Sequence, residues 1–467
     1  MPHIYAVTNV PPEILAYGMA KYSRSKQSLE DNLRELSGDQ AEKFLQTFYF
    51  DYGHASIADL AHIAVAIEDI SILAAMDIVD EPLWDGQERS TRYQNFDRSS
   101  YYCPQAVHPA YDLITQELFD LYRHIQEQSL AMLTDQYPKP ATIPEKRYAR
   151  TMRARAFDIA RYCLPLNTLT SLGQITSARV LEQQIRRLMA SFLPELQEIA
   201  HELKESIAKR PAIDLSQSGN KQPLMPTLVK YTEADSYRLA LRNIFEPLAQ
   251  KIPSLPSTNV ELTFQPPLLD SQVAQLLYAY GHVSYRSCLA YVQDLSNAEK
   301  QELLSLAFSE RGTHDEWPRL MRQAPLQFDM VVDIGAFRDF NRHRRVQKIS
   351  QQINPNLLFA IPEPLIQARA EGNFVTSLTN HYSRLSSLDL PTQLVPYLLP
   401  LAHKRRFLMS MDLPEAAYII ELRSRSQGHF SYRHLAWQMY EAIQSDYPEF
   451  ARHIRITPPE SFNPFQR

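Results

Sequence analysis

Glycine and cysteine are both scarce in this sequence, and each shortage argues against a class of site. Only 11 of the 467 residues are glycine, and no two lie close enough for the glycine-rich turn of a dinucleotide fold or the phosphate loop of an NTPase. The three cysteines, Cys103, Cys163 and Cys288, have no two-residue spacing, so neither a disulfide framework nor a cysteine zinc site is indicated. A phosphorylated ligand would have to be held by side-chain cations and helix ends.

The chain also lacks an excess of positive charge and a long hydrophobic run. Its 48 Lys and Arg against 53 Asp and Glu give a formal net charge of −5, which offers no general attraction to nucleic acid or anionic membrane. Charges interrupt every apolar stretch before it reaches bilayer length, and the N-terminal residues do not form a signal peptide. We expect a cytoplasmic protein with no nucleic-acid or membrane partner, and no metal site, because no residues have ligand spacing.

One short motif occurs twice in the chain. Gly53-His54-Ala55-Ser56 returns as Gly281-His282-Val283-Ser284, and each copy has the serine of a helix start. A Leu-Pro pair, Leu164-Pro165, returns at a similar offset as Leu399-Pro400. The repetition predicts two related domains that together span most of the chain.

Strand patterns alternate with helix patterns in both halves, which predicts an α/β or α+β domain twice over, each a central sheet flanked by long helices. A polar, proline-bearing segment without apolar period separates them. The expected domains are 1–210 and 227–467, with a linker at 211–226. The expected elements are strands at 61–67 and 328–332, helices at 71–79 and 335–344, and long helical stretches at 154–207 and 394–443 that break at the Leu-Pro pairs.

The strongest local signal is a run of cations, Arg342-His343-Arg344-Arg345. Arg338, Arg342 and Arg345 are spaced by four and three residues, so we expect them to share one helix face. Such a concentration of charge needs a nearby anion, to which Asp339 could contribute. A solvated face or an internal salt-bridge network explains the run equally well, and a nucleic-acid patch is a less favoured third interpretation.

A second polar cluster, Glu88-Arg89-Ser90-Thr91-Arg92-Tyr93, follows the first copy of the motif. In an extended segment Glu88, Ser90 and Arg92 point the same way, which suits a ligand with an amide-like edge and a phosphate. An ordinary edge strand is the competing interpretation. His54 and His282 stand where histidines are more often caps or satisfied core residues than ligands.

Taken together, these motifs resemble those of the flavin-dependent thymidylate synthases, the family that methylates dUMP with methylenetetrahydrofolate, a flavin and NADPH. That family has a Gly-His-x-Ser helix start and an Arg-His-Arg followed by Glu-x-Ser-x-Arg-Tyr. It continues with Ala-Arg-x-x-Leu-Pro, Asn-x-Arg and a late Leu-Arg, and its sites form where protomers meet in a tetramer. This chain looks like two such protomers fused, which implies a homodimer that imitates the tetramer.

The first half carries the nucleotide-binding part of this resemblance. It keeps Gly53-His54-x-Ser56, Glu88-x-Ser90-x-Arg92-Tyr93 and Ala160-Arg161-x-x-Leu164-Pro165. Arg179 matches the arginine of Asn-x-Arg, with Ser177 in place of the asparagine. Asp80-Glu81-Pro82 replaces the Arg-His-Arg, and Arg187-Leu188 stands where the late Leu-Arg is expected.

The second half keeps the opposite set. It has Gly281-His282-x-Ser284, Arg342-His343-Arg344 and Leu422-Arg423, followed by Gly428-His429-x-Ser431-Tyr432-Arg433. Ser350-Gln351-Gln352-Ile353-Asn354-Pro355 replaces Glu-x-Ser-x-Arg-Tyr, Pro396 replaces the early arginine, and Asp412-x-Pro414 replaces Asn-x-Arg. The losses are complementary, which suggests one composite site built from both halves.

The resemblance implies FAD as cofactor, NADPH and methylenetetrahydrofolate as co-substrates and dUMP as substrate. It assigns Arg423 as the catalytic residue beside the pyrimidine, assigns Arg342, His343, Arg344, His54, Ser56, Arg179, His282 and Ser284 to the flavin, and assigns Glu88, Ser90, Arg92, Tyr93 and Arg161 to dUMP. Two alternatives stay open. One is a flavin enzyme that acts on another nucleotide or one-carbon substrate, and the other is a catalytically inactive relic that binds nucleotide or flavin.

Overall fold

The computed structural model divides the chain into two compact units, each assembled from separate parts of the sequence. The first unit is Met1–Arg89, Tyr101–Val107 and Thr168–Ser254, and the second is Ser90–Ser100, His108–Asn167 and Leu255–Arg467. Residues 108–167 of the first predicted domain therefore fold with the second half of the chain. The structure describes residues 7, 9–22, 28–34, 57–91, 96, 100–104, 108–210, 224, 232–236, 239–240, 242–243, 259–264, 268–280, 283–309, 311, 317, 321–322, 325–353, 355–459 and 463–465.

The first unit contains a three-stranded antiparallel sheet in the order β1-β3-β2. The helices α4 and α7 pack on the central strand, and α8 packs on α7. Helix α4 is almost entirely apolar and buried, which explains why it lies against the sheet. The elements are α1 (Pro12–Tyr22), α2 (Leu29–Arg34), β1 (His62–Ser71), α4 (Ile72–Val79), β2 (Asp85–Glu88), β3 (Leu169–Ser177), α7 (Ala178–Met189) and α8 (Pro194–Ala208).

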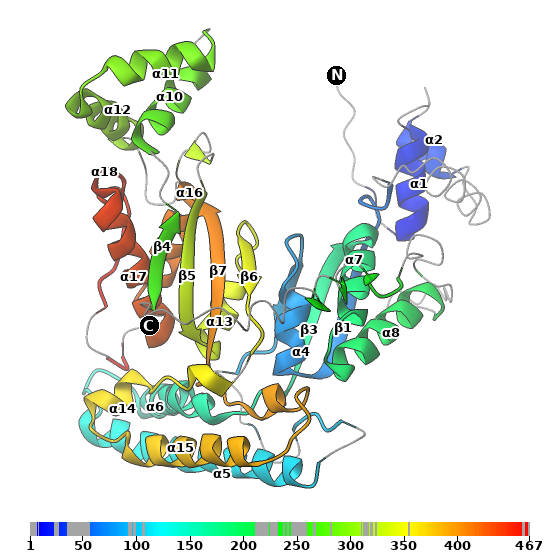
Figure 1. Ribbon diagram of the computed structural model, residues 1–467, viewed down its shortest axis with the longest axis vertical. Helices are drawn as coiled ribbons and strands as arrows, with labels where there is room; N and C mark the ends of the chain where they lie inside the picture. The colour runs from blue at the N-terminus through cyan, green and yellow to red at the C-terminus, as the bar shows by residue number, and fades with distance from the viewer. Residues whose placement is uncertain are drawn as a thin grey trace. The chain divides into compact units, whose positions relative to one another are not determined.

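The second unit contains a four-stranded antiparallel sheet in the order β4-β5-β7-β6, and its strands lie side by side in Figure 1. Helices α13, α16 and α17 pack against this sheet. No helix in the described part of the chain is both long enough and apolar enough to cross a bilayer. The elements are α5 (Ala110–Gln136), α6 (Glu145–Ala160), η3 (Arg161–Cys163), β4 (Val260–Phe264), α10 (Leu268–Tyr280), α11 (Tyr285–Asp294), α12 (Asn297–Ser309), β5 (Pro325–Asp333), α13 (Ile334–Asn341), β6 (Gln347–Ser350), η5 (Pro355–Leu357), α14 (Glu363–Gln367), α15 (Gly372–Ser387), η6 (Val395–Leu398), β7 (Lys404–Asp412), α16 (Leu413–Arg423), α17 (Phe430–Asp446) and α18 (Pro448–Ala451).

The two sheets repeat one arrangement, since β1-β3-β2 and β5-β7-β6 have the same order and strand direction. In both units the first two long strands of this arrangement, β1 and β3 in the first and β5 and β7 in the second, each run directly into a helix. The last residue of each of these strands caps that helix by accepting a hydrogen bond from the backbone N–H three residues on. The caps are Ser71 to Ala74 (2.9 Å), Ser177 to Val180 (3.4 Å), Asp333 to Ala336 (2.8 Å) and Asp412 to Glu415 (2.8 Å).

A buried hydroxyl–carboxylate contact also recurs, with its partners exchanged. In the first unit the Ser71 hydroxyl, at the end of β1, donates to the Glu195 carboxylate in the first turn of α8 at 2.5 Å. In the second unit the Asp333 carboxylate, at the end of β5, accepts from the Ser431 hydroxyl in the first turn of α17. The interaction is the same although the residue types have changed places, which indicates descent of both units from one ancestral fold.

The expected strands at 61–67 and 328–332 and the expected helix at 71–79 are confirmed in β1, β5 and α4. The long helical stretches expected at 154–207 and 394–443, each broken only at its Leu-Pro pair, are wrong, because β3 and β7 lie inside them. The buried side of β3 carries threonine and glutamine while Ile175 is 53 % exposed, which inverts the usual polarity pattern. Six of the nine residues of strand β7 are lysine, arginine, leucine or methionine, which favour helices.

The two Leu-Pro segments of the sequence, 162–167 and 397–402, meet inside the second unit. Pro165 pairs with Pro400 in an isolated antiparallel bridge, and the backbone hydrogen bonds around it are reciprocal. Reciprocity of this kind is the signature of a two-fold interface between like subunits, here within one chain. The bonds run from Leu166 N–H to Leu399 O (2.9 Å), from Leu401 N–H to Leu164 O (2.9 Å), from Asn167 N–H to Tyr397 O (3.0 Å) and from Ala402 N–H to Tyr162 O (2.9 Å).

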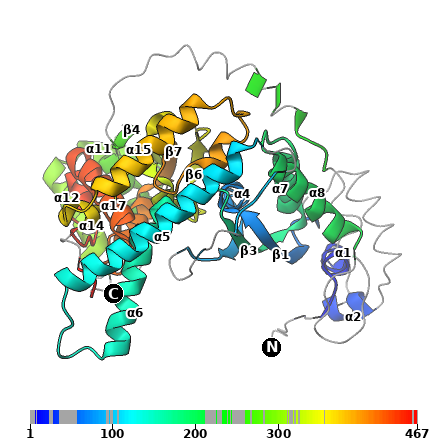
Figure 2. The same ribbon diagram turned by 90° about the horizontal axis from the view of Figure 1, so that it is seen from below.

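Helices α5 and α15 accompany this contact. Each follows the short outer strand of its own repeat in the sequence, and the two run side by side in Figure 2. The Glu117 carboxylate of α5 forms an ion pair with Arg384 of α15. Residues 108–167 of the first half, which include η3 and Arg161, therefore belong to the same compact unit as the second sheet.

Candidate functional site

The cationic run lies in the loop after α13 rather than on a helix. Helix α13 ends at Asn341, where the Lys348 ammonium donates to the Asn341 backbone oxygen (2.6 Å) and to its side-chain oxygen (2.7 Å). A cation at the last carbonyl satisfies that acceptor and favours termination there. The expected shared helix face is therefore wrong, because only Arg338 lies on the helix while Arg342 and Arg345 follow it.

This loop lines a cavity of about 230 Å³ in the second unit. Four arginines and one histidine surround the cavity, and Glu415 is the only acid among its lining residues. The Arg345 Nε atom lies 3.6 Å from Glu415 Oε2, so this acid offsets part of the charge. The lining contains more cationic than acidic side chains, and Trp317 and Tyr418 add aromatic rings, a composition that suits a phosphorylated aromatic ligand. Its lining comprises Trp317, Arg322, Arg342, His343, Arg344, Arg345, Pro414, Glu415 and Tyr418.

His343 is buried in the wall of this cavity and is neutral. Its Nε2 atom accepts a hydrogen bond from Arg423 Nε at 3.0 Å, so the ring proton is on Nδ1, 3.9 Å from Glu415 Oε1. Burial, reinforced by the charges of Arg423, Lys348 and Arg342, lowers the pKa of His343 to about 3. His343 therefore orients its neighbours and supplies no charge of its own at neutral pH.

Arg423, the last residue of α16, is held from three sides. Its Nη2 donates to the Asp339 backbone oxygen at 2.7 Å, and its Nη1 lies 3.4 Å from the Asp339 carboxylate. The guanidinium also lies over the ring of Tyr432, 5.3 Å from the centroid. Asp339 thus supplies the counter-charge expected from the sequence, and it does so for Arg423.

The first unit has an equivalent arginine in a different electrostatic setting. Arg187, near the end of α7, donates through Nη2 to the Asp77 backbone oxygen at 2.7 Å, as Arg423 does to Asp339. Its Nε bonds Glu81 at 2.7 Å, where Arg423 meets the neutral His343. The first unit therefore fills this position with an internal salt bridge.

Arg161 lies in the second unit although it comes from the first half of the sequence. It is 3 % exposed, and its Nη1 lies 3.4 Å from the hydroxyl of Thr91. Its Nε and Nη2 atoms are buried and have no hydrogen-bond partner among the described residues. A Cβ on Gly335, in the first turn of α13, would lie 3.5 Å from Nη2, so the guanidinium lies close to that turn. Buried donors without acceptors are costly unless a ligand satisfies them.

The other predicted site residues divide into three groups. Glu88 ends β2 in the first unit, and Ser90 follows it in the loop assigned to the second unit, so the expected extended run stops at Glu88. Arg179 of α7 pairs with Asp59 at 2.9 Å, and Ser284 caps α11 as the sequence predicts. His54, Ser56, Arg92, Tyr93 and His282 lie outside the described residues.

Four residues that line the cationic cavity were not predicted from the sequence. Trp317 and Arg322 come from the segment before β5, and Glu415 and Tyr418 come from α16. Only Tyr418 had an available signal, since it precedes Arg423 by five residues in the sequence; its side chain is 46 % exposed. The remaining three reach the cavity through tertiary packing.

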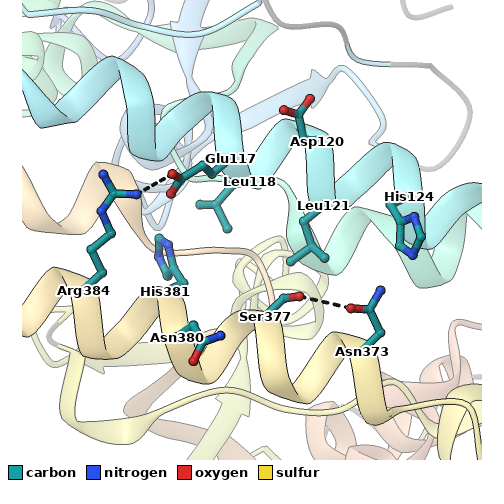
Figure 3. A pocket seen from close by; sticks show the side chains of 10 residues that line it. All are labelled: Glu117, Leu118, Asp120, Leu121, His124, Asn373, Ser377, Asn380, His381 and Arg384. Atoms are coloured by element: carbon teal, nitrogen blue, oxygen red, sulfur yellow. Dashed lines mark hydrogen bonds and ion pairs between the residues drawn. The ribbon is translucent and has the colours of Figure 1, made fainter.

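A larger cavity, about 570 Å³, lies between α5 and α15 (Figure 3). Its arginine, Arg384, is already paired with Glu117. His381 donates from Nε2 to the Leu398 backbone oxygen at 2.9 Å, and burial lowers its pKa to about 4, so its ring is neutral. None of the predicted site residues lines this cavity. It offers no surplus cation and is the weaker candidate for a phosphorylated ligand.

The buried histidines predict a stability loss in acid. The lowered pKa values of His343 and His381 mean that the unfolded chain, with the ordinary value of 6.5, takes up protons first as the pH falls. The free energy of unfolding should therefore decline from pH 6.5 to about 4, by about 1.4 kcal/mol per pH unit for each histidine. Urea denaturation at several pH values measures this. His343→Gln should make the decline of the unfolding free energy with falling pH less steep. His434→Gln, which changes an exposed ion pair with Glu363, should leave the slope unchanged. Equal slopes for the wild type and both variants would contradict the assignment of the decline to the buried His343.

Comparison with known proteins agrees with this arrangement. The family model described as "Thymidylate synthase complementing protein" matches residues 6–210 and 268–449. A UPF0159 protein from Chlamydia muridarum is 26 % identical over 97 % of this chain and 92 % of its own length, and one from Chlamydia pneumoniae is 26 % identical over 93 % and 87 %. A UPF0159 protein from Thermoplasma acidophilum is 25 % identical over 94 % of both. This chain belongs to the thymidylate synthase complementing protein family, the flavin-dependent thymidylate synthases, and carries the family fold as a tandem duplication.

Proposed function

We propose that this protein catalyses the flavin-dependent reductive methylation of dUMP to dTMP, with methylenetetrahydrofolate and NADPH, at a site composed of both repeats. The observation that carries the proposal is the composition of the second unit. It contains the cationic loop and Arg423 of the second repeat together with Arg161 of the first. Arg161, from the set that the first repeat retains, thus lies in the same compact unit as the Arg-His-Arg loop and Arg423 that the second repeat retains.

The cationic cavity fits the phosphates of a flavin dinucleotide. Arg342 and Arg344 provide bidentate donors, and neutral His343 provides a fixed wall. A volume of about 230 Å³ is below the range of roughly 300–1,000 Å³ for whole small-molecule sites, so the cavity accommodates part of FAD. When bound, the flavin supplies the hydride-transfer chemistry, and the residues of this chain bind and orient it.

The nucleotide would be held by residues from the first repeat. Arg161, Ser90 and Arg92 would hold the dUMP phosphate, while Glu88 and Tyr93 would meet the sugar or base. The unsatisfied nitrogens of Arg161 support this role, because an anion would complete their hydrogen bonds. Arg423 would lie against the uracil carbonyl and stabilise negative charge as C5 becomes nucleophilic.

Among the other residues assigned to flavin, Arg179 and Ser284 already have local partners, and the proposal does not depend on them. His54, Ser56 and His282 keep their assignment by motif alone. We also propose that two chains associate as a dimer that reproduces the family tetramer, with domains at 1–210 and 227–467 around a linker at 211–226. The reciprocal contact between 162–167 and 397–402 supports this, since one two-fold interface is already present within each chain.

Flavin binding is the first test of the function. The purified protein should bind FAD, measured by absorbance and by titration, with one FAD per chain. A single site is expected because the first repeat has Asp80-Glu81-Pro82 in place of Arg-His-Arg, and Glu81 is bonded to Arg187. A protein with no affinity for FAD would favour the inactive relic, and two FAD per chain would contradict the complementary loss.

Substrate identity is the second test. Expression of the chain should restore growth of a thymidine auxotroph without added thymidine. A flavin-loaded protein that fails to convert dUMP in vitro would favour the alternative of a flavin enzyme with another nucleotide or one-carbon substrate.

A further inference from the structure

The hydroxyl of Thr91 lies between two arginines that come from opposite repeats. Its Oγ1 is 3.4 Å from Nη1 of Arg161, in the first repeat, and 3.3 Å from Nη1 of Arg338, in the second. All three residues belong to the second unit, and Thr91 is 4 % exposed. Because the oxygen accepts from both guanidinium groups, its own proton is left to donate to a further acceptor.

The unsatisfied donors of Arg161 call for an anion beside this cluster. The Nη1 atoms of Arg161 and Arg338 lie 3.4 Å and 3.3 Å from the same Thr91 Oγ1 atom. The two positive charges are therefore close to each other. The nearby Asp333 carboxylate acts electrostatically with Arg161, but it already accepts from the Ser431 hydroxyl and from Ala336 N–H. The buried Nε and Nη2 of Arg161 have no acceptor among the described residues.

We propose that Arg338 is a second phosphate-binding arginine, and that Arg161, Arg338 and Thr91 together receive the phosphate monoester of the nucleotide. This inference rests on the proposed function, because it concerns the same nucleotide site. Two guanidinium forks and a hydroxyl match the charge and the oxygens of a phosphate dianion better than those of a carboxylate. The second repeat therefore contributes to the phosphate site, which the family motifs assign to the first repeat alone.

Calorimetric titration of the full-length protein with dUMP, 2′-deoxyuridine and inorganic phosphate tests the proposal. Arg338→Ala should weaken dUMP binding by about 10- to 100-fold, the loss typical of a charge-assisted hydrogen bond, and should abolish the affinity for inorganic phosphate. The affinity for deoxyuridine should change by less than about twofold, because that ligand has no phosphate. The dUMP affinity of Arg338→Lys should lie between those of the wild type and Arg338→Ala, since lysine keeps the charge but lacks the guanidinium fork.

Two further variants separate the role of Arg338 from a structural one. Thr91→Val removes the shared acceptor at nearly constant volume. It should weaken the binding of dUMP but not the binding of deoxyuridine. Arg123→Ala, which removes an exposed ion pair on α5, should change the affinity for neither ligand. If Arg338→Ala proves unstable, the comparison of Arg338→Lys with Arg338→Gln carries the same prediction.

The outcomes distinguish this inference from the proposed function. If the wild type binds dUMP and Arg338→Ala binds it equally well, the inference is wrong while the function stands. If the wild type binds phosphate but not dUMP, and Arg338→Ala loses phosphate, the inference stands while the dUMP assignment is wrong. Binding of neither ligand by the wild type would overturn both.

Discussion

Replacing Arg423 with alanine is expected to lower the rate of dTMP formation by about 10²- to 10³-fold, the usual cost of removing a donor that stabilises developing negative charge. The guanidinium is already oriented by Asp339, by Nε2 of His343 and by the ring of Tyr432. Little further ordering is needed when charge develops on the uracil, so most of the loss should fall on kcat. Single-turnover kinetics with FAD and dUMP at saturation measures it.

Arg187→Ala is the matched control for this experiment. Both arginines donate to the last turn of the neighbouring helix at 2.7 Å, and their side chains are 15 % and 18 % exposed. The two substitutions should therefore lower the free energy of unfolding by similar amounts. Only Arg423→Ala should lose catalysis; if both variants lose activity equally, Arg423 has a structural role in the fold and no special role in the reaction.

Arg342→Ala and Arg161→Ala are expected to produce opposite binding defects. Arg342 lines the cationic cavity, and its loss should raise the Kd for FAD by at least about tenfold, enough for the purified protein to lose its flavin. Arg161 is buried with unsatisfied donors, and its loss should raise the Kd for dUMP by about 100-fold while FAD is retained. Titration of each variant with each ligand gives the four affinities.

The stability of these variants provides an independent check. A buried cation whose donors lack acceptors stabilises the fold weakly, so Arg161→Met should unfold at a temperature close to that of the wild type in the absence of ligand. Added dUMP should then raise the unfolding temperature of the wild type but not of Arg161→Met. Equal loss of both ligands in both arginine variants would contradict the division of the site between the repeats.

The fold could be predicted where local chemistry and burial point the same way. Strand β5 places Leu326, Phe328, Met330 and Val332 on its buried side, and Asp333 then caps α13, so strand, turn and helix follow from neighbouring residues. Strand β3 was missed because its buried side is polar: Gln174 is 2 % exposed and bonds Trp84 and Gln184. Such a network forms only when three distant segments meet, so no local pattern announces it.

The sequence by itself determined the duplication, the family and the complementary loss of motifs, because these are properties of residue identity and order. Tertiary structure decided where the retained residues meet. The reciprocal backbone contact between 162–167 and 397–402 places Arg161 in the unit that holds the cationic loop. Tertiary structure also pairs Arg187 with Glu81 in a salt bridge, whereas it places Arg423 beside the neutral His343. Burial sets the charge of that histidine and the value of each ion pair, and burial exists only after the chain has folded.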